Sequence, residues 1–313
     1  MSDAHDHDHG STGHVHGFGG DRGARALAIA LVLNGVYTLV EAVVGFSSGS
    51  LALVADAGHN LSDVLALGLA LVAVRLAARP ATANRSFGYK RAEILAALAN
   101  ALTLVVIAVL IFVEASRRFA NPPDVPGIDL IVVASIGLAI NAIGAALVFR
   151  RGGENLNLRA SFLHLAGDAI GSLGVIAAGV IIMTTGWPYA DPLFSVLLGI
   201  LILGSAWTVL RDSVLVLLEA SPRGVDAAAI GRQLAAHPGV VNVHDLHVWE
   251  ITSGFPALTA HVLVRPGDDC HGTRRQLEEL LHERFGIDHT TLQVDHAADA
   301  HLVQIQGTSH GQC

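Results

Sequence analysis

Six long apolar segments dominate the sequence, and each is close to the length of about 20 residues that a helix needs to cross a bilayer. Glycine, serine and proline mark the breaks between them. Over the whole chain 52% of residues are apolar and 15% are charged, against about 25% charged in soluble domains. These features predict a membrane all-α six-helix transmembrane bundle and exclude an ordinary soluble enzyme. The expected spans are residues 25–46, 51–76, 92–114, 128–149, 160–184 and 190–210.

The basic residues between these spans predict the orientation, because cytoplasmic loops are enriched in positive charge. Eleven basic residues fall on one side of the membrane, and two, Arg117 and Arg118, fall on the other. We therefore expect a multi-pass protein of the cell (inner, cytoplasmic) membrane with both termini in the cytoplasm. The eleven residues are Arg22, Arg25, Arg75, Arg79, Arg85, Lys90, Arg91, Arg150, Arg151, Arg159 and Arg211.

The chain after the sixth span differs in character. Residues 212–313 hold 13 acidic and 6 basic residues, which is −7 of the net charge of −8; this excess disfavours nucleic acid as a partner and favours cations. The pattern predicts helices and strands in the order αββαβ, a small α+β domain. We expect four parts: a flexible His-rich cytoplasmic tail (1–23), the six-span domain (24–211), a cytoplasmic domain (212–300) and a flexible tail (301–313).

Two of the spans carry ionisable side chains, which are costly inside a bilayer and usually functional. The second span contains His59 and Asp63, and the fifth contains His164 and Asp168. Each pair is four residues apart, so its members share one helix face. The two spans cross in opposite directions, so packing them side by side places His59 toward Asp168 and Asp63 toward His164. We expect small neighbours to let the two helices approach closely: Gly58, Ser62, Gly167, Gly171 and Gly174.

Two imidazoles and two carboxylates suit tetrahedral Zn²⁺ and also admit Co²⁺ and Cd²⁺. The chain has two cysteines, Cys270 and Cys313, so we expect neither a disulfide framework nor a thiolate site. Two aspartates balance the charge of a divalent ion, and without the ion they favour protons. We therefore expect this site to exchange metal for H⁺.

Further polar residues lie in or beside the spans. Asp56 precedes His59 by three residues, and three roles stay open for it: supporting a metal ligand, carrying a proton, or packing helices. We expect the others to be mainly structural: Asn34, Glu41, Glu93, Asn100 and Asn141.

The paired His-x-x-x-Asp motifs resemble those of the cation diffusion facilitator family, closest to its zinc/cadmium/cobalt-type bacterial members. The resemblance covers about residues 25–296 and includes the stretches Ser50–Asp56, Phe87–Glu93 and His244–Trp249. It implies a homodimeric metal/proton antiporter whose cytoplasmic domain has a metallochaperone-like fold, binds metal and dimerises. In that family His in both motifs accompanies zinc-type substrates, whereas Asp in place of the first His accompanies broader or manganese-type substrates.

The cytoplasmic histidines form a second candidate site. His244 and His247 lie on the first expected strand, His261 on the second, and Asp295 at the end of the third, where strand neighbours would meet at a sheet edge. The resemblance places regulatory ligands at His244, His261 and residues 293–295. Gln293 stands where some relatives have His, and His247 is a candidate replacement. The alternative is exposed surface histidines. The loop 77–91 has no His, Cys, Asp or Glu, so we expect no metal site there.

Taken together, the residues and the resemblance predict a transporter rather than an enzyme. We expect it to export Zn²⁺, and also Cd²⁺ or Co²⁺, in exchange for H⁺ without a cofactor, with Zn²⁺ as a further regulatory ligand. The N-terminal histidines (5, 7, 9, 14 and 16) either gather zinc or belong to a simple tail. The rivals are a Mn²⁺/Fe²⁺ or Co²⁺/Ni²⁺ carrier, a membrane metal sensor that transports nothing, and a membrane metallohydrolase. The last is disfavoured because four protein ligands leave no open metal position.

Overall fold

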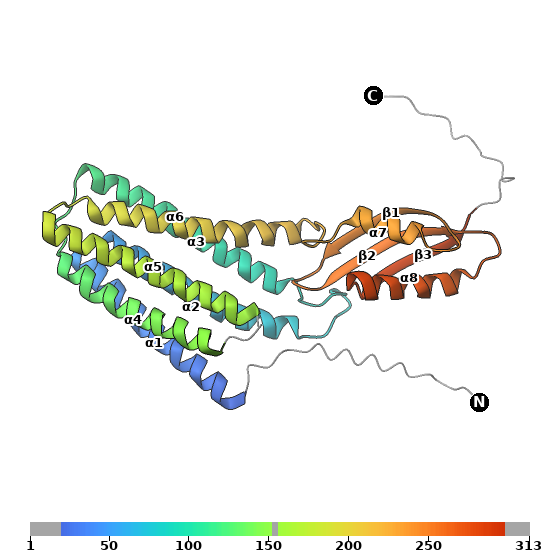
Figure 1. The fold of residues 1–313 in the computed structure, drawn as a ribbon, viewed down its shortest axis with the longest axis horizontal. Coiled ribbons are helices and arrows are strands. Elements are labelled where there is room, and N and C mark those ends of the chain that lie inside the picture. The colour runs from blue at the N-terminus through green and yellow to red at the C-terminus, as the bar shows by residue number, and fades with distance from the viewer. Residues whose placement is uncertain (1–19, 152–155, 298–313) are drawn as a thin grey trace, which may run out of the picture. The chain divides into compact units, whose positions relative to one another are not determined.

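The structure, a computed structural model, describes residues 20–151 and 156–297. Six long helices precede two shorter helices and three strands (Figure 1). This order confirms the predicted fold class of a six-helix transmembrane bundle with a C-terminal α+β domain. The His-rich run before residue 20 and the tail 301–313 lie outside the described residues. The long helices are α1 (Gly20–Ser48), α2 (Leu51–Ala77), α3 (Ala92–Ala120), α4 (Gly127–Arg151), α5 (Leu156–Thr185) and α6 (Ala190–Leu217).

The long helices have the length and surface of membrane spans. Among the described residues, α2 to α6 each qualify to cross a bilayer by length and hydropathy. α1 is 29 residues long and carries the first apolar segment. Large apolar side chains such as Leu39, Leu110 and Ile143 are more than half exposed. Such outward-facing apolar surface suits lipid rather than water, because lipid supplies the apolar contacts that water does not.

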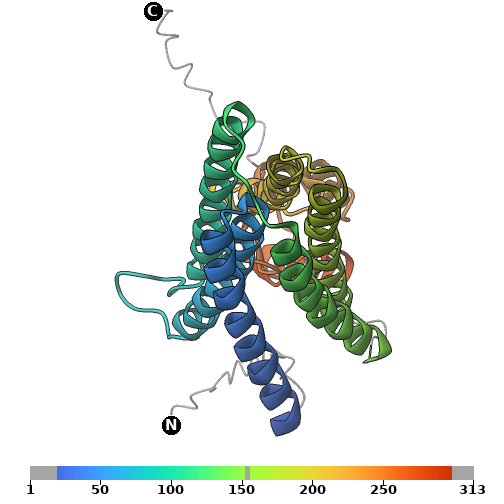
Figure 2. The ribbon, with the colours of Figure 1, turned by 90° about the vertical axis from the view of Figure 1, so that its left-hand side faces the viewer.

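The described chain divides into two compact units. The first comprises the residues up to Leu65 together with Leu104–Leu203, and the second comprises Ala66–Thr103 together with the residues from Gly204 onward. In the first unit α4 and α5 lie side by side (Figure 2). Their backbones meet at two glycines: a Cβ on Gly179 would lie 2.7 Å from the Gly127 carbonyl oxygen. Only glycine fits there without displacing a backbone.

The small residues beside the paired motifs do not make such an approach. A Cβ on Gly58 would meet its nearest neighbour, a side-chain atom of Ile107, at 3.5 Å, and a Cβ on Gly167 would meet nothing within 4 Å. The expectation that these glycines permit close backbone contact is therefore wrong. The space around them is ordinary because the long imidazole and carboxylate side chains fill the gap between α2 and α5.

The second unit contains a three-stranded sheet in the order β1-β2-β3. β1 pairs antiparallel with β2, and β2 pairs parallel with β3. The parallel pair is possible because α8 carries the chain back between β2 and β3. Apolar side chains of α7, α8 and the sheet, among them Leu234, Leu277 and Val262, form one buried core. The elements are α7 (Ala227–Ala235), β1 (Val240–Glu250), β2 (Pro256–Val264), α8 (Cys270–Phe285) and β3 (His289–His296).

Helix α8 begins at Cys270, and Asp269 caps it. The Asp269 carboxylate accepts a hydrogen bond of 2.9 Å from the Gly272 amide. This hydrogen bond, with a weaker one from the His271 amide, holds the pKa of the exposed Asp269 carboxyl below its usual value. At the other end Gly286 takes the left-handed conformation, φ 64°, which terminates helices and which glycine adopts without steric cost.

A bulge in β1 changes the direction of the histidine side chains. His244 pairs with His261 and His247 pairs with Thr259, so three steps on β1 match two on β2. Asp245 sits in the bulge with φ 53°. Without a bulge, residues three apart on a strand face opposite sides. With it, His244 and His247 lie on the same face of the sheet, the face opposite the apolar core.

Candidate metal centre

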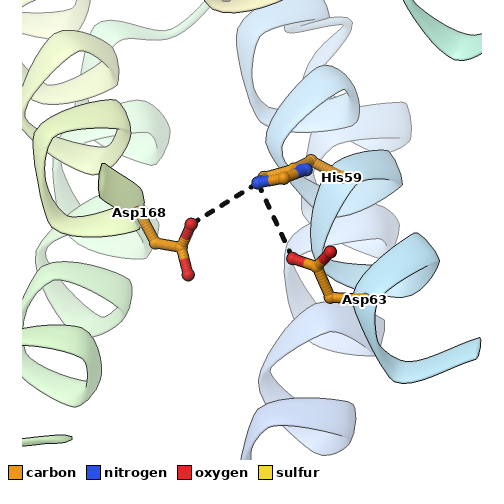
Figure 3. A group of neighbouring side chains, drawn as sticks. All are labelled: His59, Asp63 and Asp168. Carbon is orange, nitrogen blue, oxygen red and sulfur yellow. Dashed lines mark ion pairs between the residues drawn. The ribbon is translucent and has the colours of Figure 1, made fainter. Parts of the chain in front are cut away.

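Helices α2 and α5 bring both His-x-x-x-Asp motifs together. His59 Nε2 lies 3.6 Å from Asp63 Oδ2 and 3.4 Å from Asp168 Oδ1 (Figure 3). His164 Nε2 lies 3.4 Å from Asp63 Oδ2 and 3.6 Å from Asp168 Oδ2. Each imidazole is therefore slightly nearer the carboxylate of the other helix than that of its own. The four side chains form a ring in which nitrogen and oxygen alternate.

The ring is enclosed on one side and open on the other. The side chains of Asp168 and His59 are 10% and 15% exposed, whereas that of His164 is 50% exposed. The two imidazole planes meet at 74° with centroids 6.3 Å apart. Three ligand atoms, from His59, Asp63 and Asp168, all lie within 4.8 Å of one another. The site is thus accessible from the His164 side.

The spacing within the ring identifies what it can hold. The four N···O separations exceed the roughly 2.7–3.2 Å of an N–H···O hydrogen bond. Within the described residues, the buried Nδ1 of His59 has no hydrogen-bond partner. His59, Asp63 and Asp168 form a group that could hold a metal ion, and His164 lies beside both of its carboxylates.

The start of α2 is anchored by a carboxylate that the sequence analysis missed. Asp191, at the start of α6, is fully buried. It accepts hydrogen bonds from Ser50 Oγ at 2.6 Å and from the amides of Leu51 at 2.8 Å and Ala52 at 3.2 Å. Arg118 Nη1 lies 3.5 Å from the same carboxylate. The available signal in the sequence was an acidic residue at the start of the sixth span, because the free amides at a helix N-terminus attract carboxylates.

The polar residues that the sequence places in or beside the spans differ in their burial. Glu41, Asp56 and Asn141 are buried, at 0%, 2% and 6% exposure. Glu93 is exposed and accepts a hydrogen bond from Thr252 Oγ1 at 3.2 Å. Asn60, which sequence reasoning did not single out, is 3% exposed. The amide of Asn60 pairs with Glu41, so the buried polar residues of α1 and α2 form one cluster.

Of the cytoplasmic candidates, His244 and His261 meet on the face of the sheet rather than at its edge, while His247 and Asp295 contact other residues. The rings of His244 and His261 lie edge to face with centroids 5.3 Å apart. His247 Nε2 lies 3.0 Å from Asp245 Oδ1, and this contact holds the pKa of the Asp245 carboxyl below its usual value. Asp295 Oδ2 accepts a hydrogen bond of 2.7 Å from Gln293. The antiparallel register places the histidine pair on the sheet, because His261 belongs to the central strand.

Comparison with known proteins identifies the chain. Its fold is that of a multi-pass membrane protein, and a group of side chains that could hold a metal ion lies between two of the spans. Residues 27–218 match the family model described as the cation efflux transmembrane domain, and residues 222–297 match that of the cation efflux protein cytoplasmic domain. The chain therefore belongs to the cation efflux, or cation diffusion facilitator, family of transporters.

Curated relatives align along nearly the whole chain. The zinc transporter ZitB of Escherichia coli is 43% identical over 98% of this chain and 99% of its own length. The cadmium, cobalt and zinc/H(+)-K(+) antiporter of Bacillus subtilis is 40% identical, covering 92% of this chain and 94% of its own. The metal cation efflux system protein CzcD of Cupriavidus metallidurans is 40% identical over 94% and 90%. The solved metal-bound C-terminal domain of CzcD is 38% identical and covers 22% of this chain and 97% of that domain, with a TM-score of 0.22.

Proposed function

We propose that this protein exports Zn²⁺, and also Cd²⁺ or Co²⁺, from the cytoplasm in exchange for H⁺, and that His59, Asp63, His164 and Asp168 carry the ion. The observation that carries the proposal is the spacing of the ring, 3.4–3.6 Å between neighbouring nitrogen and oxygen atoms. Nitrogen and oxygen ligands lie about 2.0–2.2 Å from a zinc ion. In a tetrahedral site any two ligand atoms are therefore roughly 3.3–3.6 Å apart, about 1.63 times the metal–ligand distance.

The kind of ligand supports the same choice of metal. Imidazole nitrogen suits Zn²⁺ and its neighbours, whereas carboxylate and carbonyl oxygens alone suit Mn²⁺ and Mg²⁺. A Mn²⁺ or Fe²⁺ carrier is therefore the weaker alternative. The names of the relatives agree, since they describe a zinc transporter, a cadmium, cobalt and zinc antiporter, and a metal cation efflux protein.

Charge balance supports exchange for protons. Asp63 and Asp168 together neutralise one divalent ion, and the low dielectric around the site favours a neutral state. When the ion leaves, protons on the same four side chains restore that neutrality. Binding metal and binding protons are then mutually exclusive, which is the requirement for antiport. Rocking of the helices around this fixed site would expose it alternately to the two sides of the membrane.

We also propose a membrane orientation and a role for the cytoplasmic domain. The six-span part (24–211) lies in the cell membrane with both termini in the cytoplasm, flanked by tails (1–23 and 301–313). Residues 212–300 form a cytoplasmic domain that makes the homodimer and binds regulatory Zn²⁺ at His244, His247, His261 and Asp295. The shared sheet face of the three histidines supports this second ligand set.

The test is zinc flux into proteoliposomes under an imposed pH gradient. Wild-type flux should follow the gradient, and D63A and D168A should lower it at least about 100-fold, more than the loss of a supporting residue typically costs. D124N, which neutralises an exposed carboxylate of the same unit, should behave as wild type. Flux that ignores the gradient would refute proton exchange. Zinc binding without any flux would favour the non-transporting metal sensor.

A further inference from the structure

A second pair of ionisable groups is buried beside the metal centre. Glu41 of α1 and Asp56 of α2 are 0% and 2% exposed. Asn60, one turn after Asp56 on α2, donates a hydrogen bond of 3.1 Å to Glu41, so Glu41 reaches the face of α2 on which Asp56 lies. Two buried carboxyl groups on neighbouring helices are costly to ionise together, because burial disfavours the charged form and like charges repel. A single proton held by the pair relieves both costs.

The surroundings of the pair supply hydrogen-bond donors but no cation. Tyr37 Oη donates to Glu41 Oε1 at 2.8 Å, and Asn60 Nδ2 donates to Glu41 Oε2 at 3.1 Å. Among the described residues, no lysine or arginine forms an ion pair with either carboxyl. Helix α4 packs against α1 and has no titratable residue from Leu130 to Phe149. Tyr37 and Asp56 are thus the titratable groups facing Glu41.

Asp56 connects the pair to the metal centre. It precedes His59 by three residues on α2, which is about one helical turn. A Cβ on Gly171 of α5, one turn after Asp168, would lie 3.7 Å from Asp56 Oδ1. The carboxyl of Asp56 is therefore enclosed between α1 and α5. The hydrogen bonds of Glu41 come from Tyr37 and Asn60 and involve none of the four ring residues.

We propose that Glu41 and Asp56 share one exchangeable proton, which the protein releases when a divalent metal binds at the ring of His59, Asp63, His164 and Asp168. This inference rests on the proposed metal/proton exchange and identifies an additional proton site that serves it. The ion adds two positive charges near Asp56, and positive charge favours the ionised form of a carboxyl group. The proton leaves the pair as H⁺, and both carboxyl groups are then ionised. When the metal departs, the two negative charges repel each other and a proton returns.

The experiment counts the protons released per zinc ion bound by the full chain in detergent, in weakly buffered solution with a pH indicator. E41Q keeps the acceptor for Tyr37 and a donor for Asp56 but cannot share a proton. We expect E41Q to bind zinc with unchanged stoichiometry and, at saturating zinc, to release about one proton fewer per protein chain than wild type. D56N should show the same loss. Y37F, which keeps both carboxyl groups, is the matched control and should release as many protons as wild type.

Zinc binding separates this inference from the proposed function. If E41Q and D56N bind zinc and release as many protons as wild type, the shared proton is refuted while the metal centre stands. If wild type binds no zinc, or D63A and D168A bind it as tightly as wild type, the proposed function fails instead. Retained zinc stoichiometry also shows that each variant is folded, so D56N decides the question if E41Q fails to fold.

Discussion

The carboxylate of Asp191 accepts a hydrogen bond of 2.6 Å from the hydroxyl of Ser50 and also receives the first two amides of α2. The contact ties the start of α6 to the start of α2, the helix that carries His59 and Asp63. A fully buried carboxylate with this many donors is an anchor, because each donor would otherwise be buried without a partner.

Replacing Asp191 should loosen this anchor. D191A leaves the Leu51 and Ala52 amides without their acceptor and removes one of the partners of Arg118, and we expect a loss of about 3 kcal/mol in the free energy of unfolding, typical of breaking a buried charged contact. S50A removes two hydrogen bonds, the one that Ser50 Oγ donates to Asp191 and the one that it accepts from the Leu53 amide, and should cost about 2 kcal/mol. Thermal unfolding in detergent measures both. A D191A protein that unfolds at the wild-type temperature would show that the contact contributes nothing to stability.

The contact between α4 and α5 gives a second prediction. G179A places a methyl group against the Gly127 backbone, where 2.7 Å separates it from the carbonyl oxygen. Backbone cannot yield as a side chain can, so we expect a destabilisation of about 1–3 kcal/mol. G167A is the matched control, because a Cβ there meets nothing within 4 Å, and it should be neutral or slightly stabilising. Equal unfolding temperatures for the two variants would contradict the close packing.

The fold can be predicted well from the sequence because each helix or strand is indicated by many residues together. Each span is specified by about 20 apolar residues, and an error at one position does not move it. The order αββαβ follows from alternation over whole strands. The helix ends are less predictable, because single contacts set them: α8 starts at Cys270, where Asp269 caps it.

The metal centre is predictable in part, for a geometric reason. Four-residue spacing fixes a common face for His59 and Asp63, and for His164 and Asp168, whatever the surrounding structure. Contacts between distant helices follow no such rule. Asp191 is 141 residues from Ser50, and no periodicity connects them. The bulge at Asp245 likewise changes the face on which His247 lies, and alternation along a strand cannot reveal an inserted residue.

The cap of α8 yields a prediction about pH. Hydrogen bonds from the Gly272 and His271 amides hold the pKa of the Asp269 carboxyl below its usual value. The unfolded value is about 3.9. A group whose pKa is lower in the folded state contributes stability above the unfolded pKa and loses it as the pH falls through the folded pKa. The amides of the first turn of α8 should therefore stay protected from hydrogen exchange at pH values below the ordinary aspartate pKa. This turn should fray only in stronger acid.

Amide hydrogen exchange of the first turn of α8 in the full chain measures this effect. The matched control is D269N, whose amide oxygen still caps the helix but does not titrate, so the ratio of wild-type to D269N exchange removes the intrinsic pH dependence of exchange. We expect that ratio to be constant above the ordinary aspartate pKa and to rise at lower pH. A constant ratio down to the lowest pH would contradict the cap.

The choice of metal gives the last prediction. H59D exchanges an imidazole nitrogen for a carboxylate oxygen at the same point of the ring, so three of the four ligands become carboxylates. Oxygen ligands favour Mn²⁺ relative to Zn²⁺, and we expect the ratio of Zn²⁺ to Mn²⁺ flux to fall at least about tenfold. Proteoliposomes loaded with a metal indicator measure both fluxes under the same pH gradient.

The control for H59D is H59A, which removes the ligand without replacing it. H59A should reduce the flux of both metals, because three ligands remain for either ion. A preserved preference for Zn²⁺ in H59D would mean that the spacing of the ring, at 3.4–3.6 Å between neighbouring atoms, selects the metal and the imidazole does not. If H59D loses its preference for Zn²⁺ over Mn²⁺ but keeps the total metal flux of wild type, the nitrogen ligand determines selectivity. Retained flux would indicate that α2 and α5 pack in H59D as they do in wild type.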